Sequence, residues 1–318
     1  MTTRRVSIAA IAAATLALAD SAAAQGYPDR VIELIVPSTP GSSADILGRV
    51  LTDSMGAQFG QRFVVLNKAG GSSILGTAEV ARAKPDGYTL MHGAAFSITV
   101  QPLTERQTGY TADSFTPICQ TFKNDQVIVT RPGTYKSVAD LLAASKAKDG
   151  GLNYGIPGLG TIPHLSMEEL SQIAKVPFNR VPFRGPAESI QMTIAGQIEF
   201  AVAPLTAAAN SGLVMPALFA EKRNPAIADV PTVKEEGFNV APLSIGGLYA
   251  PAGLPADIKN KLEAACIAAK DSQPFQRIVK STLQPSDYFA DSAGFAANLK
   301  KDVEDKKRLL TALGMVKN

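Results

Sequence analysis

The sequence contains few of the residues that form metal centres. Its 318 residues include two histidines, His92 and His164, and two cysteines, Cys119 and Cys266, and the members of each pair lie far apart in the chain. Neither an H-E-x-x-H pair nor the acidic spacing of a calcium loop is present. We therefore expect no metal site, and the sequence indicates no other cofactor.

The motifs of nucleotide binding and covalent catalysis are also missing. The stretch GIPGLGT at 155–161 lacks the Gly-Lys-Ser/Thr ending of a P-loop, and no G-x-G-x-x-G follows a strand with an acid downstream. There is no G-x-S-x-G elbow, and Ser166 lies two positions from His164, a spacing that points side chains apart on a helix. These absences argue against a nucleotide-dependent enzyme and a hydrolase.

Long apolar runs are absent beyond the first residues. Arg4 and Arg5 precede an apolar run over 6–18 and three alanines at 22–24, the order typical of a secretory signal peptide. The run is shorter than the roughly 20 residues that a membrane span needs. We expect residues 1–24 to be a signal peptide that directs export, with a retained N-terminal anchor as the alternative.

A strong excess of charge of either sign is absent as well. The formal charge of +3 falls to +2 once the leader with its two arginines and one aspartate is removed, so we expect no nucleic-acid partner. The length of the mature chain indicates about two domains. In an exported protein the two cysteines permit one disulfide, and the sequence leaves open both this bridge and two buried free thiols.

Predicted strands alternate with predicted helices along the chain. VIELIVP at 31–37 predicts a buried strand that ends in a loop before Asp45 begins a helical pattern. Strand, glycine loop and helix recur at 62–83, and a second α/β block starts near Gln126. This alternation predicts an α/β protein with mainly parallel sheets that helices cover on both faces. Amphipathic helices are expected from Ala256 onward.

The two blocks predict two lobes joined by a strand-like hinge. The C-terminal helices are long enough to return to the first block, so we assign residues 25–124 and 248–318 to lobe 1 and residues 125–247 to lobe 2.

Four loops follow predicted strands and precede predicted helices, and all four are rich in small residues. They are STPGSSAD (38–45), NKAGGSS (67–73), GIPGLGT (155–161) and FRGPAE (183–188). Loops at the carboxyl ends of parallel strands converge on one crevice. Helix N-termini there favour an anion, and a carboxylate fits because it accepts several charge-assisted hydrogen bonds. For any one loop alone, a helix cap without a ligand is the favoured explanation. Four such loops in one exported two-lobe chain favour a ligand site.

Five segments, in order, resemble the substrate-binding proteins of tripartite tricarboxylate transporters, the Bug or TctC-like receptors. They are VPSTPGSSADILGRVL, VVLNKAGGSSILGTAEVARAKPDGYTL, NYGIPGLGTIPHLSMEEL, VPFRGPAES and ADVPTVKEEGF. The resemblance covers nearly all of the mature chain. It implies a two-lobe, type II-like periplasmic-binding-protein fold, the Venus flytrap, in a periplasmic receptor without catalytic activity. Such receptors deliver small organic acids to a membrane permease.

The resemblance also implies a set of ligand-binding residues in the loops of both lobes. These are Thr39, Gly41, Ser42, Ser43, Asn67, Ala69, Gly70, Ser72, Ala94, Ala95, Gly158, Gly160, Thr161, His164, Phe183 and Arg184. Backbone groups and the hydroxyls of Ser42, Ser43, Ser72 and Thr161 would hold one carboxylate. Asp45 is expected to be the N-cap or a first-turn acid of its helix and not a ligand contact, because an ionised acid would repel the ligand.

Two departures from the family pattern bear on the ligand. AVAPL at 201–205 lacks the acid found in many relatives, which disfavours an amino-bearing ligand. Arg184 replaces the more usual lysine and could clamp a second carboxylate with its planar fork, although a solvated surface position is an equal alternative. The sequence thus favours a monomeric receptor for an aliphatic or aromatic dicarboxylate. A sensor for a signalling partner and an exported enzyme acting on a carboxylic acid are the alternatives.

Overall fold

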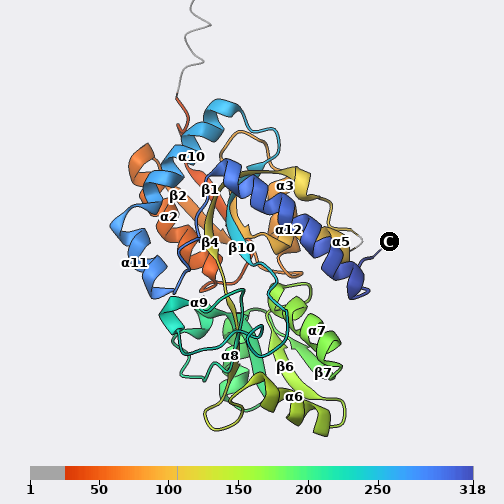
Figure 1. Ribbon diagram of the computed structural model, residues 1–318. Helices are drawn as coiled ribbons and strands as arrows, with labels where there is room; N and C mark the ends of the chain where they lie inside the picture. Colours follow the sequence, from red (N-terminus) through yellow and green to blue (C-terminus); the bar gives the residue numbers. More distant parts are fainter. Residues whose placement is uncertain (1–25, 106, 318) are drawn as a thin grey trace, which may run out of the picture.

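The protein is described by a computed structural model, in which residues 26–105 and 107–317 form two α/β lobes stacked end to end (Figure 1). The predicted signal peptide lies outside the described residues. Within them, no helix is both long and apolar enough to cross a membrane.

The first lobe is built on a five-stranded sheet in the order β2-β1-β3-β10-β4. Its strands are β1 (Ile32–Val36), β2 (Phe63–Asn67), β3 (Thr89–Ala94), β4 (Phe115–Lys123) and β10 (Ile245–Pro251). Its helices are α2 (Ser43–Phe59), α3 (Ile74–Ala81), α4 (Phe96–Thr99), α5 (Gln101–Thr104), the 3-10 turn η2 (Ala112–Ser114), α10 (Ala256–Lys270), α11 (Gln273–Ser281) and α12 (Ser292–Ala312).

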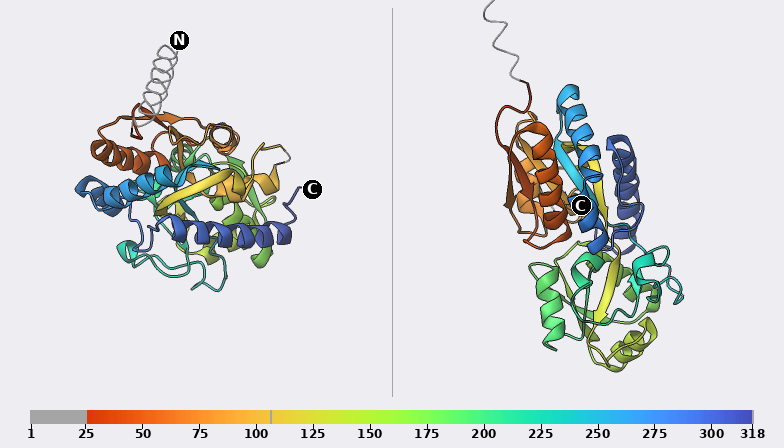
Figure 2. Two further views of the ribbon diagram at one scale, coloured as in Figure 1. Left: turned by 90° about the horizontal axis from the view of Figure 1, so that it is seen from above. Right: turned by 90° about the vertical axis from the view of Figure 1, so that its left-hand side faces the viewer.

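Helices cover both faces of this sheet (Figure 2). Leu34 of β1 belongs to an apolar cluster with residues of α2, α10 and α11, whereas its neighbour Ile35 belongs to a cluster with residues of α3 and α12. Successive residues of a strand point to opposite faces, so the continuous apolar run in β1 buries both sides of the sheet.

The second lobe has a sheet in the order β7-β6-β8-β5-β9. Its strands are β5 (Gln126–Thr130), β6 (Leu152–Ile156), β7 (Phe178–Pro182), β8 (Phe200–Pro204) and β9 (Leu218–Phe219). Its helices are α6 (Val138–Ala147), α7 (Ile162–Ala174), α8 (Pro186–Ile194), α9 (Leu205–Ala208) and the 3-10 turn η3 (Pro225–Ile227). Residues of α6 and α7 pack on one face of the sheet, and residues of α8 and α9 pack on the other.

The expectation of mainly parallel sheets is wrong for the strands near the hinge. β1 is parallel to β2 and β3, and β6 is parallel to β7 and β8, but β10 is antiparallel to β3 and β4, and β5 is antiparallel to β8 and β9. The physical reason is the path of the chain. β5 and β10 each enter a sheet from the other lobe, so they begin at the cleft, where the strands beside them end.

Two crossing segments join the lobes and lie side by side. β4 leads into β5 through Asn124 and Asp125, and the chain returns through Ser244 into β10. The Asn124 N–H donates to the Ser244 carbonyl at 2.8 Å, which ties the two segments together. β10 starts at Ile245, so the boundary expected at residue 248 falls inside a strand of the first sheet.

The two cysteines form a disulfide within the first lobe. Cys119 of β4 is bonded to Cys266 of α10, with a Cα–Cα distance of 6.6 Å. Both residues are fully buried. Of the two alternatives that the sequence left open, the structure therefore has the bridge.

Candidate functional site

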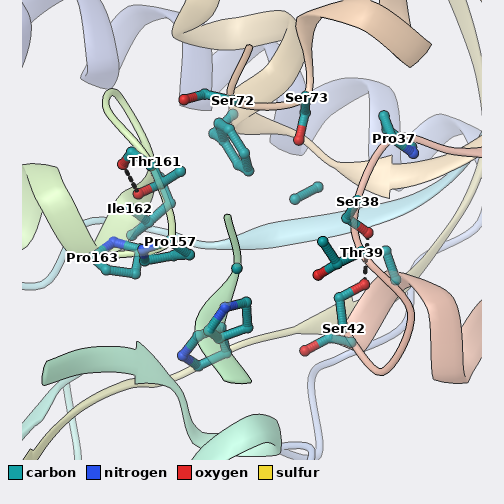
Figure 3. Close-up of a pocket in the computed structure, with 18 of the residues that line it drawn as sticks. Pro37, Ser38, Thr39, Ser42, Ser72, Ser73, Pro157, Thr161, Ile162 and Pro163 are labelled. Atoms are coloured by element: carbon teal, nitrogen blue, oxygen red, sulfur yellow. Dashed lines mark hydrogen bonds between the residues drawn. The ribbon is translucent and has the colours of Figure 1, made fainter. Parts of the chain in front are cut away.

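A cavity of about 440 Å³ lies between the lobes, and all four glycine-containing loops contribute to it. Figure 3 shows residues of the first lobe facing residues of the second across the cavity: Pro37, Ser38, Thr39, Ser42, Ser72 and Ser73 on one side and Pro157, Thr161, Ile162 and Pro163 on the other. These loops follow β1, β2, β6 and β7 and lead into α2, α3, α7 and α8. The cavity is therefore surrounded by the N-terminal ends of helices from both lobes, where backbone N–H groups attract negative charge.

Serine hydroxyls form the wall at the start of α2. Ser42 is the N-cap of this 17-residue helix and accepts a hydrogen bond from the Asp45 N–H at 3.2 Å. The hydroxyls of Ser38 and Ser42 lie 2.6 Å apart and share a hydrogen bond. Ser43 follows at the first helical position, and its Oγ is buried without a hydrogen-bond partner among the described residues. This wall thus has unused hydrogen-bonding capacity next to a positive helix end.

Asp45 stabilises this loop from behind. Its carboxylate accepts hydrogen bonds from the Gly41 N–H, from Arg49 Nε and from Asn67 Nδ2, each at 2.9 Å. Burial opposes ionisation of the carboxyl, but these hydrogen bonds and the charge of Arg49 outweigh it, so the pKa of Asp45 lies below its ordinary value. Asp45 is therefore an ionised acid in the first turn of α2, and Arg49 balances its charge. The N-cap itself is Ser42, and Asp45 does not line the cavity.

His164 holds the opposite loop in the second lobe. Its Nδ1 accepts a hydrogen bond from the Gly160 N–H at 3.0 Å, and its Nε2 faces Glu168 Oε1 at 3.4 Å. The hydroxyl of Thr161 donates to the Gly158 carbonyl at 2.7 Å (Figure 3). The histidine thus fixes the shape of the loop at the start of α7, from a position 2% exposed and behind the cavity wall.

One charged side chain, that of Arg184, is among the described residues that line the cavity. Arg184 is exposed at the start of α8, and its backbone N–H donates to Glu188 Oε2 at 2.9 Å. Its guanidinium has no ion-pair partner among the described residues. The net charge of the lining is therefore positive.

The two lobes touch at the mouth of the cleft. Gly158 lies against Ser72, where a Cβ at position 158 would come within 2.8 Å of the serine Oγ. Gln101 Nε2 donates to the Leu159 carbonyl at 3.3 Å. Behind these contacts, residues of α7, α12 and the α4–α5 segment form one apolar cluster between the lobes. The structure therefore shows a closed cleft.

Eleven of the sixteen residues expected at the ligand line the cavity: Thr39, Ser42, Ser43, Ala69, Gly70, Ser72, Ala94, Gly158, Thr161, Phe183 and Arg184. Gly41, Asn67, Ala95, Gly160 and His164 are not among the lining residues. These five hold the loops instead: besides the contacts given above, the Ala95 N–H donates to the Ile245 carbonyl at 2.8 Å and Asn67 Nδ2 donates to the Ser38 carbonyl at 3.2 Å.

The sequence did not point to the floor of the cavity. It is formed by residues of the crossing segments and their neighbours, namely Phe122, Asn124, Gln126, Pro204 and Ser244. The strand β4 was also missed, because FTPICQTFK carries a proline and lacks a glycine loop and helix after it. The one available signal was the start of an apolar strand at Gln126, which marks where the chain enters the second lobe.

Fold and cavity together define a two-lobe solute-binding receptor, and the comparisons with known proteins specify the family. The sequence matches the family described as "Tripartite tricarboxylate transporter family receptor" over residues 47–315. It is 32% identical to a UPF0065 protein in the gbd 5′ region of Cupriavidus necator, with 97% of each chain covered.

Solved structures agree with this assignment. The periplasmic binding protein BugD superposes with a TM-score of 0.83 at 26% identity, covering 92% of this chain and 100% of BugD. The R. palustris protein Rpa4515, solved with adipate, superposes with a TM-score of 0.84 at 25% identity, covering 91% and 99%. The chain belongs to the tripartite tricarboxylate transporter receptor family, the Bug or TctC-like proteins. The members of this family are periplasmic solute-binding receptors and not enzymes.

Proposed function

We propose that this protein is a periplasmic receptor that closes its lobes over a small dicarboxylate and delivers it to a tripartite tricarboxylate-type permease. The observation that carries the proposal is the closed cavity. Helix N-termini and the unpaired hydroxyl of Ser43 lie at one part of it, and Arg184, which has no ion-pair partner among the described residues, lies at another. The 24-residue leader expected from the sequence supports the periplasmic location. The family supports the permease as partner.

The loops of both lobes offer a site for the first carboxylate. Ser42, Ser43 and Ser72 of the first lobe and Thr161 of the second line the same cavity. Each charge-assisted hydrogen bond contributes roughly 1.5–3 kcal/mol net. Three such bonds supply much of the roughly 8 kcal/mol that a micromolar dissociation constant requires. The Thr161 hydroxyl already donates to the Gly158 carbonyl, so the second lobe would contribute the backbone N–H groups at the start of α7. Because donors would come from both lobes, binding would stabilise the closed form over the open one.

Arg184 offers a site for the second carboxylate. Its guanidinium forms a planar fork that matches a carboxylate with two parallel hydrogen bonds. An acidic side chain that would compete for this cation is absent from the described lining. A ligand with one carboxylate would leave the arginine without a partner, so the arrangement favours a ligand with two.

The rest of the lining is apolar and suits a hydrocarbon body between the carboxylates. Phe96, Phe122 and Phe183 line the cavity together with several prolines. Sugars would place hydroxyls against these groups without hydrogen-bond partners, at a cost of about 1–3 kcal/mol for each buried unpaired group. That the relative Rpa4515 was solved with adipate supports the same ligand class.

A ligand screen tests this proposal. The mature protein, residues 25–318, is heated with aliphatic and aromatic mono-, di- and tricarboxylates, amino acids and sugars, and any ligand that raises the melting temperature is titrated by calorimetry. We expect the largest shifts with dicarboxylates, since a ligand that binds the folded state raises its stability. Stabilisation by sugars or amino acids alone would refute the proposal.

A further inference from the structure

Gln126 has an unused hydrogen-bond acceptor on the floor of the cavity. It is the first residue of β5, and it pairs with Pro204 of β8, another lining residue. The side chain is 1% exposed. Its Nε2 donates to the Asn124 carbonyl at 3.2 Å, whereas its Oε1 has no hydrogen-bond partner in the part of the chain that the structure describes.

Unpaired buried polar atoms are concentrated at this cavity. Among the described residues, four buried side-chain atoms have no hydrogen-bond partner: Ser43 Oγ, Gln126 Oε1, His164 Nε2 and Tyr249 Oη. Two of the four belong to lining residues. Buried polar groups in native proteins are nearly always paired, so an exception in a binding cavity indicates a partner that the ligand provides.

The neighbouring polar groups of the hinge are already in use. Asn124 Oδ1 accepts a hydrogen bond from the Thr206 hydroxyl at 3.2 Å, and Gln284 Nε2 contacts the same Thr206 oxygen at 3.2 Å. The hydrogen bond from Gln126 Nε2 to the Asn124 carbonyl connects the amide to this hinge network. The bond orients the amide before a ligand arrives, and such preorganisation favours discrimination between ligands.

We propose that Gln126 makes this receptor prefer dicarboxylates that carry a hydroxyl group. The proposal rests on the function proposed above and specifies a chemical group, a hydroxyl, that the bound dicarboxylate carries. An amide oxygen accepts hydrogen bonds, so its partner must be a donor. Of the two common donors, an ammonium group would lack a carboxylate to balance it among the described lining residues, whose one charged side chain is the cation Arg184. A hydroxyl needs no balancing charge.

The size of the expected preference follows from the cost of leaving Oε1 unpaired. A ligand with a methylene group at this point keeps the acceptor buried without a partner, whereas a hydroxyl pairs it. An oxo group is also an acceptor, so it too leaves Oε1 without a donor. We expect hydroxylated dicarboxylates to bind at least tenfold more tightly than their unsubstituted and oxo analogues.

The test is calorimetric titration of the mature protein and of Gln126→Met with three sets of compounds. They are succinate, malate and oxaloacetate; glutarate, 2-hydroxyglutarate and 2-oxoglutarate; and the monocarboxylates propionate, lactate and pyruvate. Methionine keeps the length of the side chain and removes the amide. Gln191→Met is the matched control, because Gln191 is exposed on α8 and is not a lining residue.

The expected result is a tenfold or larger preference for the hydroxy compound in the wild-type protein and in Gln191→Met, reduced to less than threefold in Gln126→Met. The melting temperature without ligand should be the same in all three proteins within a few degrees. A wild-type protein that binds dicarboxylates without this preference, or a preference that Gln126→Met retains, overturns the inference and leaves the proposed function standing. Binding of lactate but of no dicarboxylate, with the preference lost in Gln126→Met, overturns the proposed ligand class and supports the role of Gln126. Binding of none of the nine compounds overturns the inference, and the wider carboxylate screen described above then decides the proposed function.

Discussion

Gly185 lies directly against the side chain of Thr39, across the cleft between the lobes. A Cβ atom at position 185 would come within 2.6 Å of Thr39 Oγ1 and 3.6 Å of its Cγ2. The backbone of Gly185 is extended, with φ −174° and ψ 174°. Any residue adopts this conformation, especially before a proline such as Pro186. The closed cleft requires a glycine here, and the local backbone does not.

We therefore expect Gly185→Ala to hinder closure of the cleft without harming the folding of either lobe. Overpacking of this kind costs about 1–3 kcal/mol, which corresponds to a loss of ligand affinity of roughly 5-fold to 140-fold. Calorimetry measures the affinity, and thermal unfolding without ligand checks that the lobes remain stable.

The double variant Gly185→Ala/Thr39→Ala is the control, because it removes the atoms that the new methyl group meets. Affinity should recover relative to Gly185→Ala, beyond the effect of Thr39→Ala alone. If Gly185→Ala binds as tightly as the wild-type protein, the cleft closes in another way.

Replacing Arg184 by alanine should weaken dicarboxylates selectively. Loss of the charge-assisted hydrogen bonds of the guanidinium predicts a fall in affinity of roughly tenfold to a hundredfold, with less than a threefold change for a monocarboxylate of the same length. Arg223→Ala, which removes an exposed arginine paired with Glu235, is the matched control. Equal losses of affinity for dicarboxylates and monocarboxylates would show that Arg184 does not bind the second carboxylate.

The disulfide between Cys119 and Cys266 should contribute strongly to the stability of the first lobe. It closes a loop of 147 residues that contains the whole second lobe. Constraint of the unfolded chain by a loop of this length predicts a loss of about 2–5 kcal/mol in the free energy of unfolding for Cys119→Ala/Cys266→Ala.

Urea titration measures this loss, and the ligand affinity of the double variant should stay near that of the wild-type protein, because neither cysteine lines the cavity. Reducing agent should destabilise the wild-type protein and leave the variant unchanged. Equal stability of the two proteins under oxidising conditions would contradict the prediction.

His92 should make the stability depend on pH between about 6.5 and 4. It is fully buried, with Nδ1 donating to the Ala44 carbonyl and Nε2 accepting from the Thr121 hydroxyl, each at 2.7 Å. Burial lowers the pKa of His92 from 6.5 to about 4, against the charge of Asp45, which raises it.

The direction of the pH effect follows from proton uptake. Above pH 6.5 the histidine is neutral in the folded and the unfolded chain, so it contributes no pH dependence. Between pH 6.5 and 4 the unfolded chain binds a proton that the folded protein does not, so the free energy of unfolding falls as the pH falls, by at most about 3 kcal/mol. Urea titrations across this range should show a smaller slope for His92→Asn, which keeps a donor near the Ala44 carbonyl. Identical slopes would exclude His92 as the titrating group.

Local residue patterns predicted the elements of the fold well. The helical pattern expected to begin at Asp45 lies within α2, and the strand expected at 31–37 contains β1. The loops at 38–45, 67–73, 155–161 and 183–188 all reach the cavity. Each of these features depends on residues close in the sequence: periodic apolar positions, a capping residue, or glycine at a turn.

The parts that the sequence missed depend on the path of the chain between the lobes. Gln126 looked like an ordinary first residue of a strand, and only the antiparallel entry of β5 beside β8 places it on the cavity floor. The family resemblance placed His164 at the ligand, but His164 is not a lining residue, and its Nδ1 accepts a hydrogen bond from the Gly160 N–H that supports the loop.

The sequence by itself determined the alternation of strands and helices, the small-residue loops that begin the helices, and the match to a family of solute receptors, because these properties lie in short segments. Tertiary structure decided which loop residues line the cavity, the pairing of Cys119 with Cys266, and the contact between Gly185 and Thr39. Those contacts join residues about 150 positions apart. These contacts depend on how β5 and β10 lead the chain from one sheet to the other. The periodicity of apolar residues within a segment indicates which face is buried, and it does not indicate this path.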